Sequence, residues 1–126
     1  MIEYKDFLRT ASEILESSKD EAGKRNSISR AYYGAYHACK HTAKVLNIPE
    51  CSGQYGVHSK LIQSLINDGR THYLGQDLHT LKVLRNKADY VLDAHVSLID
   101  AKSSIKQAAY LLKDAEKIRL AHSESV

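Results

Sequence analysis

The segment SRAYYGAYHACKHTAKVL, residues 29–46, carries two helical patterns at once. Small side chains recur at helical spacing and form a narrow stripe suited to close helix packing: Ala31, Ala35, Ala38, Thr42 and Val45. At about 100° per residue, a cationic and aromatic stripe falls on another side of the same helix. Its members are Arg30, Tyr33, His37, His41 and Lys44. Because a helix needs only one buried face, the second stripe indicates a role in binding or catalysis.

The composition favours one helical domain. The 126 residues suffice for one hydrophobic core, and 6 Gly and 1 Pro are few for a many-stranded protein. The net charge of +3 permits anionic partners such as RNA or nucleotides but does not require them. We see no secretory pattern at the N-terminus and no apolar run near the roughly 20 residues of a membrane span, so we expect a cytoplasmic protein without a membrane partner.

The hydrophobic periodicity predicts four long helices and one short helix. Their expected bounds are about 2–22, 28–46, 57–67, 76–92 and from 97 onward. Ser97 and Asp100 form a capping-box-like pair at the start of the last helix. Because short loops make consecutive helices antiparallel, we predict a single all-α domain, residues 1–126, folded as an up-and-down four-helix bundle with one additional short helix. The tail at about 121–126 is expected to fray.

The first helix boundary is predicted from turn residues. Gly23 is a plausible helix stop, and the polar segment 24–27 (KRNS) reads as a turn. Within that segment, Asn26 or Ser27 is expected to cap the second helix.

Several functional classes lack their motifs. The phosphate loops G-x-x-x-x-G-K and G-x-G-x-x-G are absent, as is the G-x-S-x-G turn of a hydrolase. No Glu-x-x-His occurs, which argues against a ferritin-like di-iron site. Cys39 and Cys51 do not form a C-x-x-C pair, so neither a zinc ribbon nor a disulfide framework is expected. We predict no metal and no cofactor.

Arg85 interrupts the apolar stripe of the helix predicted at 76–92. An arginine is rarely buried unpaired, because desolvating its charge costs several kcal/mol, of order 5. Asp89 follows one helical turn later and is a ready ion-pair partner. In the alternative reading, Arg85 lies at the rim of a cleft, where its planar fork contacts a phosphate or scissile RNA. The sequence leaves both readings open.

The histidines also have two readings. His37 and His41 are four residues apart and could share a metal ion, but the sequence offers no third ligand beside them. In the alternative, one is exposed and the other hydrogen-bonded. His58 follows a glycine-containing loop and is expected to cap or tether it.

The tyrosines of the segment 29–46 divide by helix face. Tyr32 and Tyr36 lie one turn apart and are expected to pack in the core with their hydroxyls bonded. Tyr33 is expected on the same side of the helix as Arg30 and His37. There it either makes a hydrogen bond to another helix or stacks on a base or binds phosphate.

Three segments together resemble HEPN domains, most closely the small stand-alone bacterial and archaeal branch. They are SRAYYGAYHA at 29–38, GVHSKLI at 56–62 and LRNKADY at 84–90, within a match spanning about 26–115. The resemblance implies a helical bundle that forms homodimers. It also implies a metal-independent ribonuclease of a toxin–antitoxin, CRISPR or phage-defence system, often paired with a minimal nucleotidyltransferase.

The nuclease motif of the HEPN family is Arg, four to six residues, then His. Arg85 and Asn86 match its start, but Tyr90 stands where the histidine is expected, and His95 is too far along the chain. A tyrosine with a pKa near 10 is a poor general base at neutral pH, although it can hydrogen-bond a phosphate. The resemblance assigns Arg85 and Tyr90 as candidate catalytic residues. The expected RNA- or nucleotide-binding cleft comprises Arg30, Tyr33, His37, Arg85, Asp89 and Tyr90.

Three hypotheses follow. The leading one is a HEPN-type domain that binds or acts on RNA or nucleotides in a toxin–antitoxin or defence-type pair with a nucleotidyltransferase. The second is a non-catalytic protein-interaction module whose Arg/Asp/Tyr motif is structural. The third is a metal-dependent enzyme using His37 and His41.

Overall fold

The computed structural model describes residues 2–18 and 20–125, which contain helices and loops but no β-strand. The helices are α1 (Tyr4–Ser17), α2 (Glu21–Val45), α3 (Val57–Asn67), α4 (His72–Tyr90) and α5 (Leu98–Ser125). In this part of the chain, no helix is long and apolar enough to cross a membrane. The prediction of an all-helical chain is confirmed.

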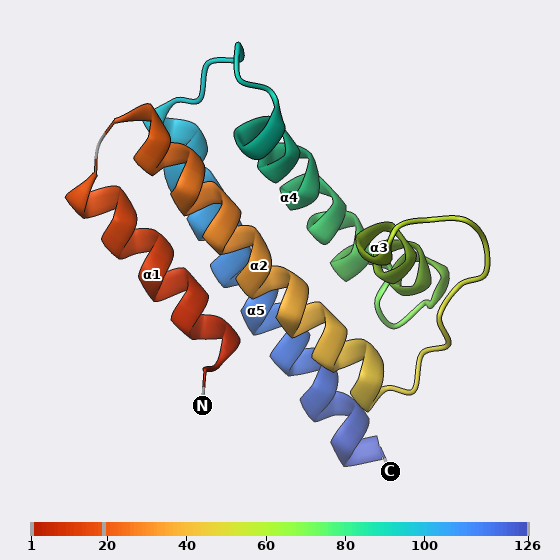
Figure 1. The fold of residues 1–126 in the computed structure, drawn as a ribbon. Helices are drawn as coiled ribbons and strands as arrows, with labels where there is room; N and C mark the ends of the chain where they lie inside the picture. The colour runs from red at the N-terminus through yellow and green to blue at the C-terminus, as the bar shows by residue number, and fades with distance from the viewer. Residues whose placement is uncertain (1, 19, 126) are drawn as a thin grey trace.

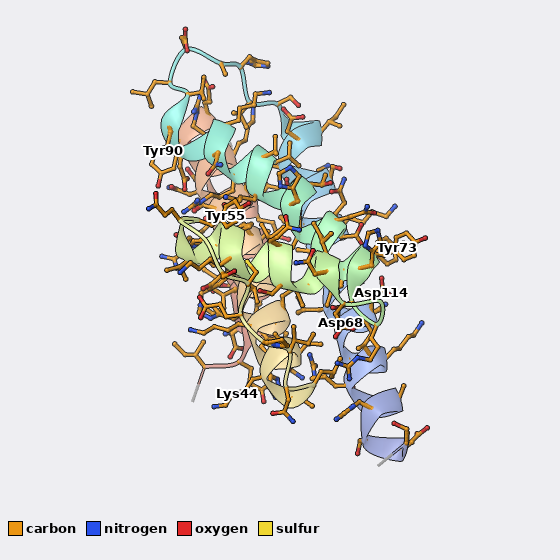
Figure 2. The ribbon with its side chains drawn as sticks, turned by 90° about the vertical axis from the view of Figure 1, so that its right-hand side faces the viewer. Lys44, Tyr55, Asp68, Tyr73, Tyr90 and Asp114 are labelled. Carbon is orange, nitrogen blue, oxygen red and sulfur yellow. The ribbon has the colours of Figure 1, made fainter. Side chains whose placement is uncertain are left out.

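The central element is α2, because it contacts each of the other four helices. Helices α1 and α4 run in the opposite direction to α2 and α5 (Figure 1). The short α3 crosses them at a steep angle (Figure 2). Small side chains permit the close approach of these neighbours, since Ala31, Ala35, Ala38 and Thr42 are fully buried. The small-residue stripe of segment 29–46 is therefore the packing face of α2.

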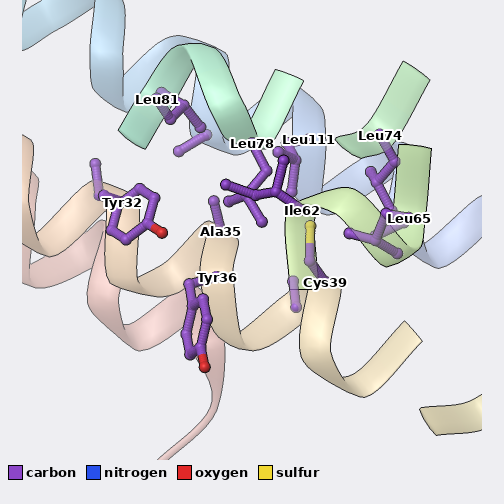
Figure 3. Close-up of a cluster of buried hydrophobic side chains, with 14 of the residues drawn as sticks. Tyr32, Ala35, Tyr36, Cys39, Ile62, Leu65, Leu74, Leu78, Leu81 and Leu111 are labelled. Atoms are coloured by element: carbon purple, nitrogen blue, oxygen red, sulfur yellow. The ribbon is translucent and has the colours of Figure 1, made fainter. Parts of the chain in front are cut away.

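The core lies where α2, α3, α4 and α5 meet. Leucines of three helices face aromatic and small side chains of α2, as Figure 3 shows: Leu65 of α3, Leu74, Leu78 and Leu81 of α4, and Leu111 of α5 surround Tyr32, Ala35 and Cys39. Tyr36 points its hydroxyl out of this cluster. Each fully buried leucine contributes roughly 1.5–3 kcal/mol, so this cluster fixes how α3 and α4 sit on α2.

The predicted boundary between the first two helices is wrong. Helix α1 ends at Ser17, and α2 already begins at Glu21. Asp20 caps α2 by accepting a hydrogen bond from the Gly23 N–H at 2.8 Å. Gly23 is buried in this first turn, where an added Cβ would lie 2.0 Å from the Ser18 carbonyl oxygen. The glycine that suggested a helix stop thus permits the chain to turn tightly before α2.

Arg25 explains why the polar segment 24–27 is helical and not a turn. Its guanidinium donates to the carbonyl oxygens of Ala88 at 2.9 Å, Val91 at 3.0 Å and Ala94 at 2.6 Å. These carbonyls lie at and just beyond the C-terminus of α4, an end that favours a cation. Arg25 therefore caps the C-terminus of α4 from within α2.

The bounds of α4 also differ from the prediction. The helix begins at His72 instead of near residue 76, and it ends at Tyr90. Gly75 is buried against α3, where an added Cβ would lie 2.8 Å from the Ile66 Cγ1 atom. The predicted start near residue 76 left Gly75 outside the helix, but this glycine lies within α4 and permits its close contact with α3.

The starts of α3 and α5 agree with the sequence. Helix α3 has the expected bounds, Val57–Asn67. The predicted capping pair before α5 is present: the Asp100 N–H donates to Ser97 Oγ and the Ser97 N–H to Asp100 Oδ2, both at 3.0 Å. The tail predicted to fray at 121–126 is helical as far as Ser125, while Val126 lies outside the described residues. Neither Gly nor Pro interrupts α5, so nothing in its sequence ends it earlier.

Candidate functional site

Arg85 of α4 is the centre of a polar cluster between α2 and α4. It is only 7% exposed, and its Nε lies 3.0 Å from Asp89 Oδ2. The Nε–H does not point at that oxygen, so the contact is an ion pair without an aligned hydrogen bond. Nη2 donates to the Tyr33 hydroxyl at 2.8 Å, and Nη1 donates to Asn86 Oδ1 at 3.0 Å. The predicted Arg85–Asp89 pair is therefore present, and α2 supplies a further partner.

Three tyrosine rings surround this guanidinium. Its carbon lies 5.3 Å from the ring centroids of Tyr32 and Tyr33 and 5.5 Å from that of Tyr90, within the range of cation–π attraction. Burial opposes the charge of Arg85, but the hydrogen bond that it donates to Tyr33, together with the neighbouring Tyr90 and Asp89, raises its pKa overall. Arg85 is thus a permanently charged group held among aromatic rings.

The structure brings a further histidine to the cluster. His58, in the first turn of α3, places Nδ1 2.7 Å from the buried Tyr32 hydroxyl. Its ring centroid lies 4.3 Å from that of Tyr36. Burial lowers the pKa of His58, and the nearby charges of Arg85, Lys82 and His37 lower it further. His58 is therefore predominantly neutral at pH 7 in a positively charged surrounding.

Nothing in the sequence predicts that His58 lies close to Arg85. The segment 56–62 predicted only that this residue follows a loop and caps or tethers it. Its contacts depend on the angle at which α3 crosses α2, which no local spacing encodes. The one available signal was that Tyr32, as a core tyrosine, needed a partner for its hydroxyl.

Arg30 and His37 lie apart from the Arg85 cluster. Both are exposed and face α1: Arg30 lines a small surface hollow with Asp6 and Phe7, and the His37 ring lies 5.3 Å from that of Phe7. Burial, together with Lys40, lowers the pKa of His37. Of the six residues expected to line one cleft, the structure brings four together: Tyr33, Arg85, Asp89 and Tyr90.

The histidine pair of α2 does not form a metal site with a third ligand in the described residues. No group of three His, Cys, Asp or Glu side chains there could hold a metal ion. His41 instead contacts the Tyr4 hydroxyl through Nδ1 at 3.2 Å. The pair thus matches the reading of one exposed and one hydrogen-bonded histidine.

The cluster presents two kinds of group to a ligand. Arg85 is buried and its donors face protein atoms, so it orients its neighbours more than it contacts solvent. Tyr90 is 69% exposed and offers a ring face and a hydroxyl. Neither a scan of protein-family models nor a search of curated proteins finds a match to the chain.

Proposed function

We propose that this chain is a HEPN-like domain that binds RNA or nucleotides at the α2–α4 surface, as part of a cytoplasmic toxin–antitoxin or defence-type pair with a minimal nucleotidyltransferase. The observation that carries the proposal is the joining of the two motif segments. The Tyr33 hydroxyl in segment 29–38 accepts a hydrogen bond from Arg85 Nη2 in segment 84–90 at 2.8 Å. Ser29 Oγ donates to Asp89 Oδ2 at 3.3 Å. The exposed Tyr90 ring beside the Arg85 cluster supplies a surface on which a base can stack.

In this proposal α1, α2, α4 and α5 are an up-and-down four-helix bundle, and α3 is the additional short helix. The alternating helix directions and the contacts of α2 support it.

We further propose a homodimer that uses the outer face of α4. Val83 on α4 and Val91 and Leu92 just after it are exposed apolar side chains, and Tyr90, which would stack on the base, lies at the edge of this group. Exposed apolar side chains grouped in this way are typical of protein interfaces. Val83→Glu would place a charge in that interface and is expected to give a monomer in analytical ultracentrifugation. Leu120→Glu on α5, with the same 55% exposure, is the matched control and should not change the mass.

Binding is favoured over cleavage by two features of the site. Tyr90 stands in the place of the motif histidine, and a phenol is a poor base at neutral pH. The donors of Arg85 are directed at Tyr33 and Asn86 and not outward. We therefore expect RNA to be bound and left intact.

The test uses two tyrosines of one helix. Tyr90 and Tyr73 are 69% and 77% exposed, and only Tyr90 adjoins Arg85. Fluorescence anisotropy with a labelled single-stranded RNA should show that Tyr90→Ala weakens binding by roughly 5- to 100-fold, the loss of one base stack. Tyr73→Ala should bind like the unaltered chain. Equal effects would remove Tyr90 from the site, and RNA cleavage abolished by Arg85→Gln would overturn the binding-only reading.

The second candidate function is a protein-interaction module without a nucleic-acid ligand. The burial of Arg85 favours it, because a guanidinium used inside the protein has few donors left for phosphate. Stoichiometric co-purification with a nucleotidyltransferase, combined with no measurable RNA binding, would support this module. A nucleotidyltransferase gene beside the one for this chain would be the simplest supporting observation for either pairing.

A further inference from the structure

A groove of about 900 Å³ lies on another part of the molecule, between the N-terminal residues, α2 and α5. Helix α1 has 14 residues, whereas α2 has 25 and α5 has 28, so the last turns of α2 and α5 extend beyond α1 (Figure 1). No residue of α3 or α4 lines the groove. Its apolar lining consists of Ile2, Leu8, Val45, Ala109, Leu112 and Leu120. The groove is therefore separate from the Arg85 cluster, and its volume lies within the range of about 300–1,000 Å³ for small-molecule sites.

Arg119 of α5 is a partly buried cation in this groove. Its Nη1 donates to Thr42 Oγ1 at 2.6 Å and its Nη2 to the Tyr4 hydroxyl at 2.9 Å. The Tyr4 ring centroid lies 5.5 Å from the guanidinium carbon. These neutral partners hold the guanidinium in place without neutralising it, and its Nε–H makes no hydrogen bond within residues 2–18 and 20–125.

The other partly buried arginines each have a carboxylate. Arg25 lies 3.1 Å from Glu21, and Arg85 lies 3.0 Å from Asp89. Arg119 has no carboxylate within 4.0 Å in the described part of the chain. Removing a guanidinium partly from water costs free energy unless an anion lies beside it. Among the partly buried arginines, Arg119 is therefore the one that an added anion would stabilise.

The charges around the groove give a small positive excess. Lys5 pairs with Glu3 at 3.6 Å, so these two charges cancel. The remaining charged lining residues are the cations Arg119 and Lys113 and the anion Glu116. Burial and the nearby charges of Arg119 and Lys44 also lower the pKa of His41, which lines the same groove. One excess positive charge beside an apolar surface fits an occupant with a single negative group and an aliphatic body.

We propose that this groove binds a small aliphatic anion, a carboxylate or a phosphate monoester, whose charged group pairs with Arg119 and whose chain covers Leu112 and Leu120. The planar fork of Arg119 suits the paired oxygens of either group. The site does not depend on the function proposed for the α2–α4 surface.

Isothermal titration with four probes separates the two halves of the site. Decanoate and decyl phosphate carry both features, decanol carries only the chain, and acetate carries only the charge. Both halves contribute if at least one ten-carbon anion binds about tenfold or more tightly than decanol and acetate, the equivalent of one charge-assisted hydrogen bond or a few buried methylenes. The tighter of the two anions identifies the head group.

Two variants and one control test the assignment of residues. Arg119→Gln should weaken binding of the anion about tenfold or more while leaving decanol affinity unchanged. Leu120→Glu adds a negative charge at an exposed position on the rim of the groove, so it should weaken binding of the anion without unfolding the protein. If Arg119→Gln does not fold, this second variant tests the site. Arg9→Gln removes an exposed arginine that does not line the groove and should have no effect. The proposal is overturned if neither anion exceeds decanol and acetate, or if both variants bind like Arg9→Gln.

Discussion

Replacing Tyr33 by phenylalanine tests whether Arg85 is held by the protein or by water. The change removes the hydroxyl that accepts from Nη2 at 2.8 Å but keeps the ring 5.3 Å from the guanidinium carbon. Because Arg85 is buried, water cannot readily replace the lost acceptor. A hydrogen bond to a charged group is worth about 1.5–3 kcal/mol, so we expect the free energy of unfolding to fall by about 2 kcal/mol.

Tyr90→Phe is the matched control. Its ring faces the same guanidinium at 5.5 Å, but its hydroxyl is on an exposed residue and makes no hydrogen bond in the described part of the chain. We expect its free energy of unfolding to change by less than about 0.5 kcal/mol. Urea denaturation followed by far-ultraviolet circular dichroism measures both values, and the dependence on urea should stay constant if only stability changes.

Equal losses in the two variants would refute this reasoning, because Arg85 would then be satisfied by solvent. It would be free to contact phosphate, and the catalytic reading would gain weight. A double-mutant cycle with Asp89→Asn extends the test. If Tyr33 and Asp89 both act through Arg85, the combined loss should differ from the sum of the single losses by about 0.5–3 kcal/mol.

Four further substitutions test the packing and the pH response, one of them as a control. Gly34→Ala should lower stability by about 1–2 kcal/mol in thermal melts, because its Cβ would lie 2.9 Å from the Tyr4 carbonyl oxygen, whereas Gly69→Ala, with nothing within 4 Å, should be neutral or slightly stabilising. Because burial lowers the pKa of His58, the folded state disfavours its protonation; stability should therefore decline as the pH falls below 6.5 through the lowered pKa, and His58→Gln should reduce this slope. A slope unchanged by the substitution would mean that other groups cause it. Ser104→Ala should raise stability by about 1 kcal/mol in urea denaturation, because the buried Ser104 hydroxyl has no hydrogen-bond partner in the described residues; a loss would indicate that a water molecule satisfies it.

The fold class was predictable because the apolar residues keep one helical period over long stretches of the chain. The apolar residues of α3, α4 and α5 keep helical spacing, and only the caps decide where each helix ends. The capping pair of Ser97 and Asp100 acts locally and was read correctly. Gly23 and Gly75 differ from the prediction because Gly23 permits a tight turn against Ser18, five residues earlier, and Gly75 permits a close contact with Ile66 of α3. A glycine that ends a helix and a glycine that lets two segments touch look the same in sequence.

The candidate site was predictable to the extent that its contacts are local. Arg85 and Asp89 are one helical turn apart, so their pairing follows from spacing alone. The stripe on α2 was less informative, because Arg30 and His37 lie roughly 40–60° around the helix from Tyr33, at about 100° per residue. That angle is enough to turn both toward α1, while Tyr33 reaches Arg85. The stripe is therefore two surfaces, and of its five members only Tyr33 hydrogen-bonds the motif of α4 in the described residues.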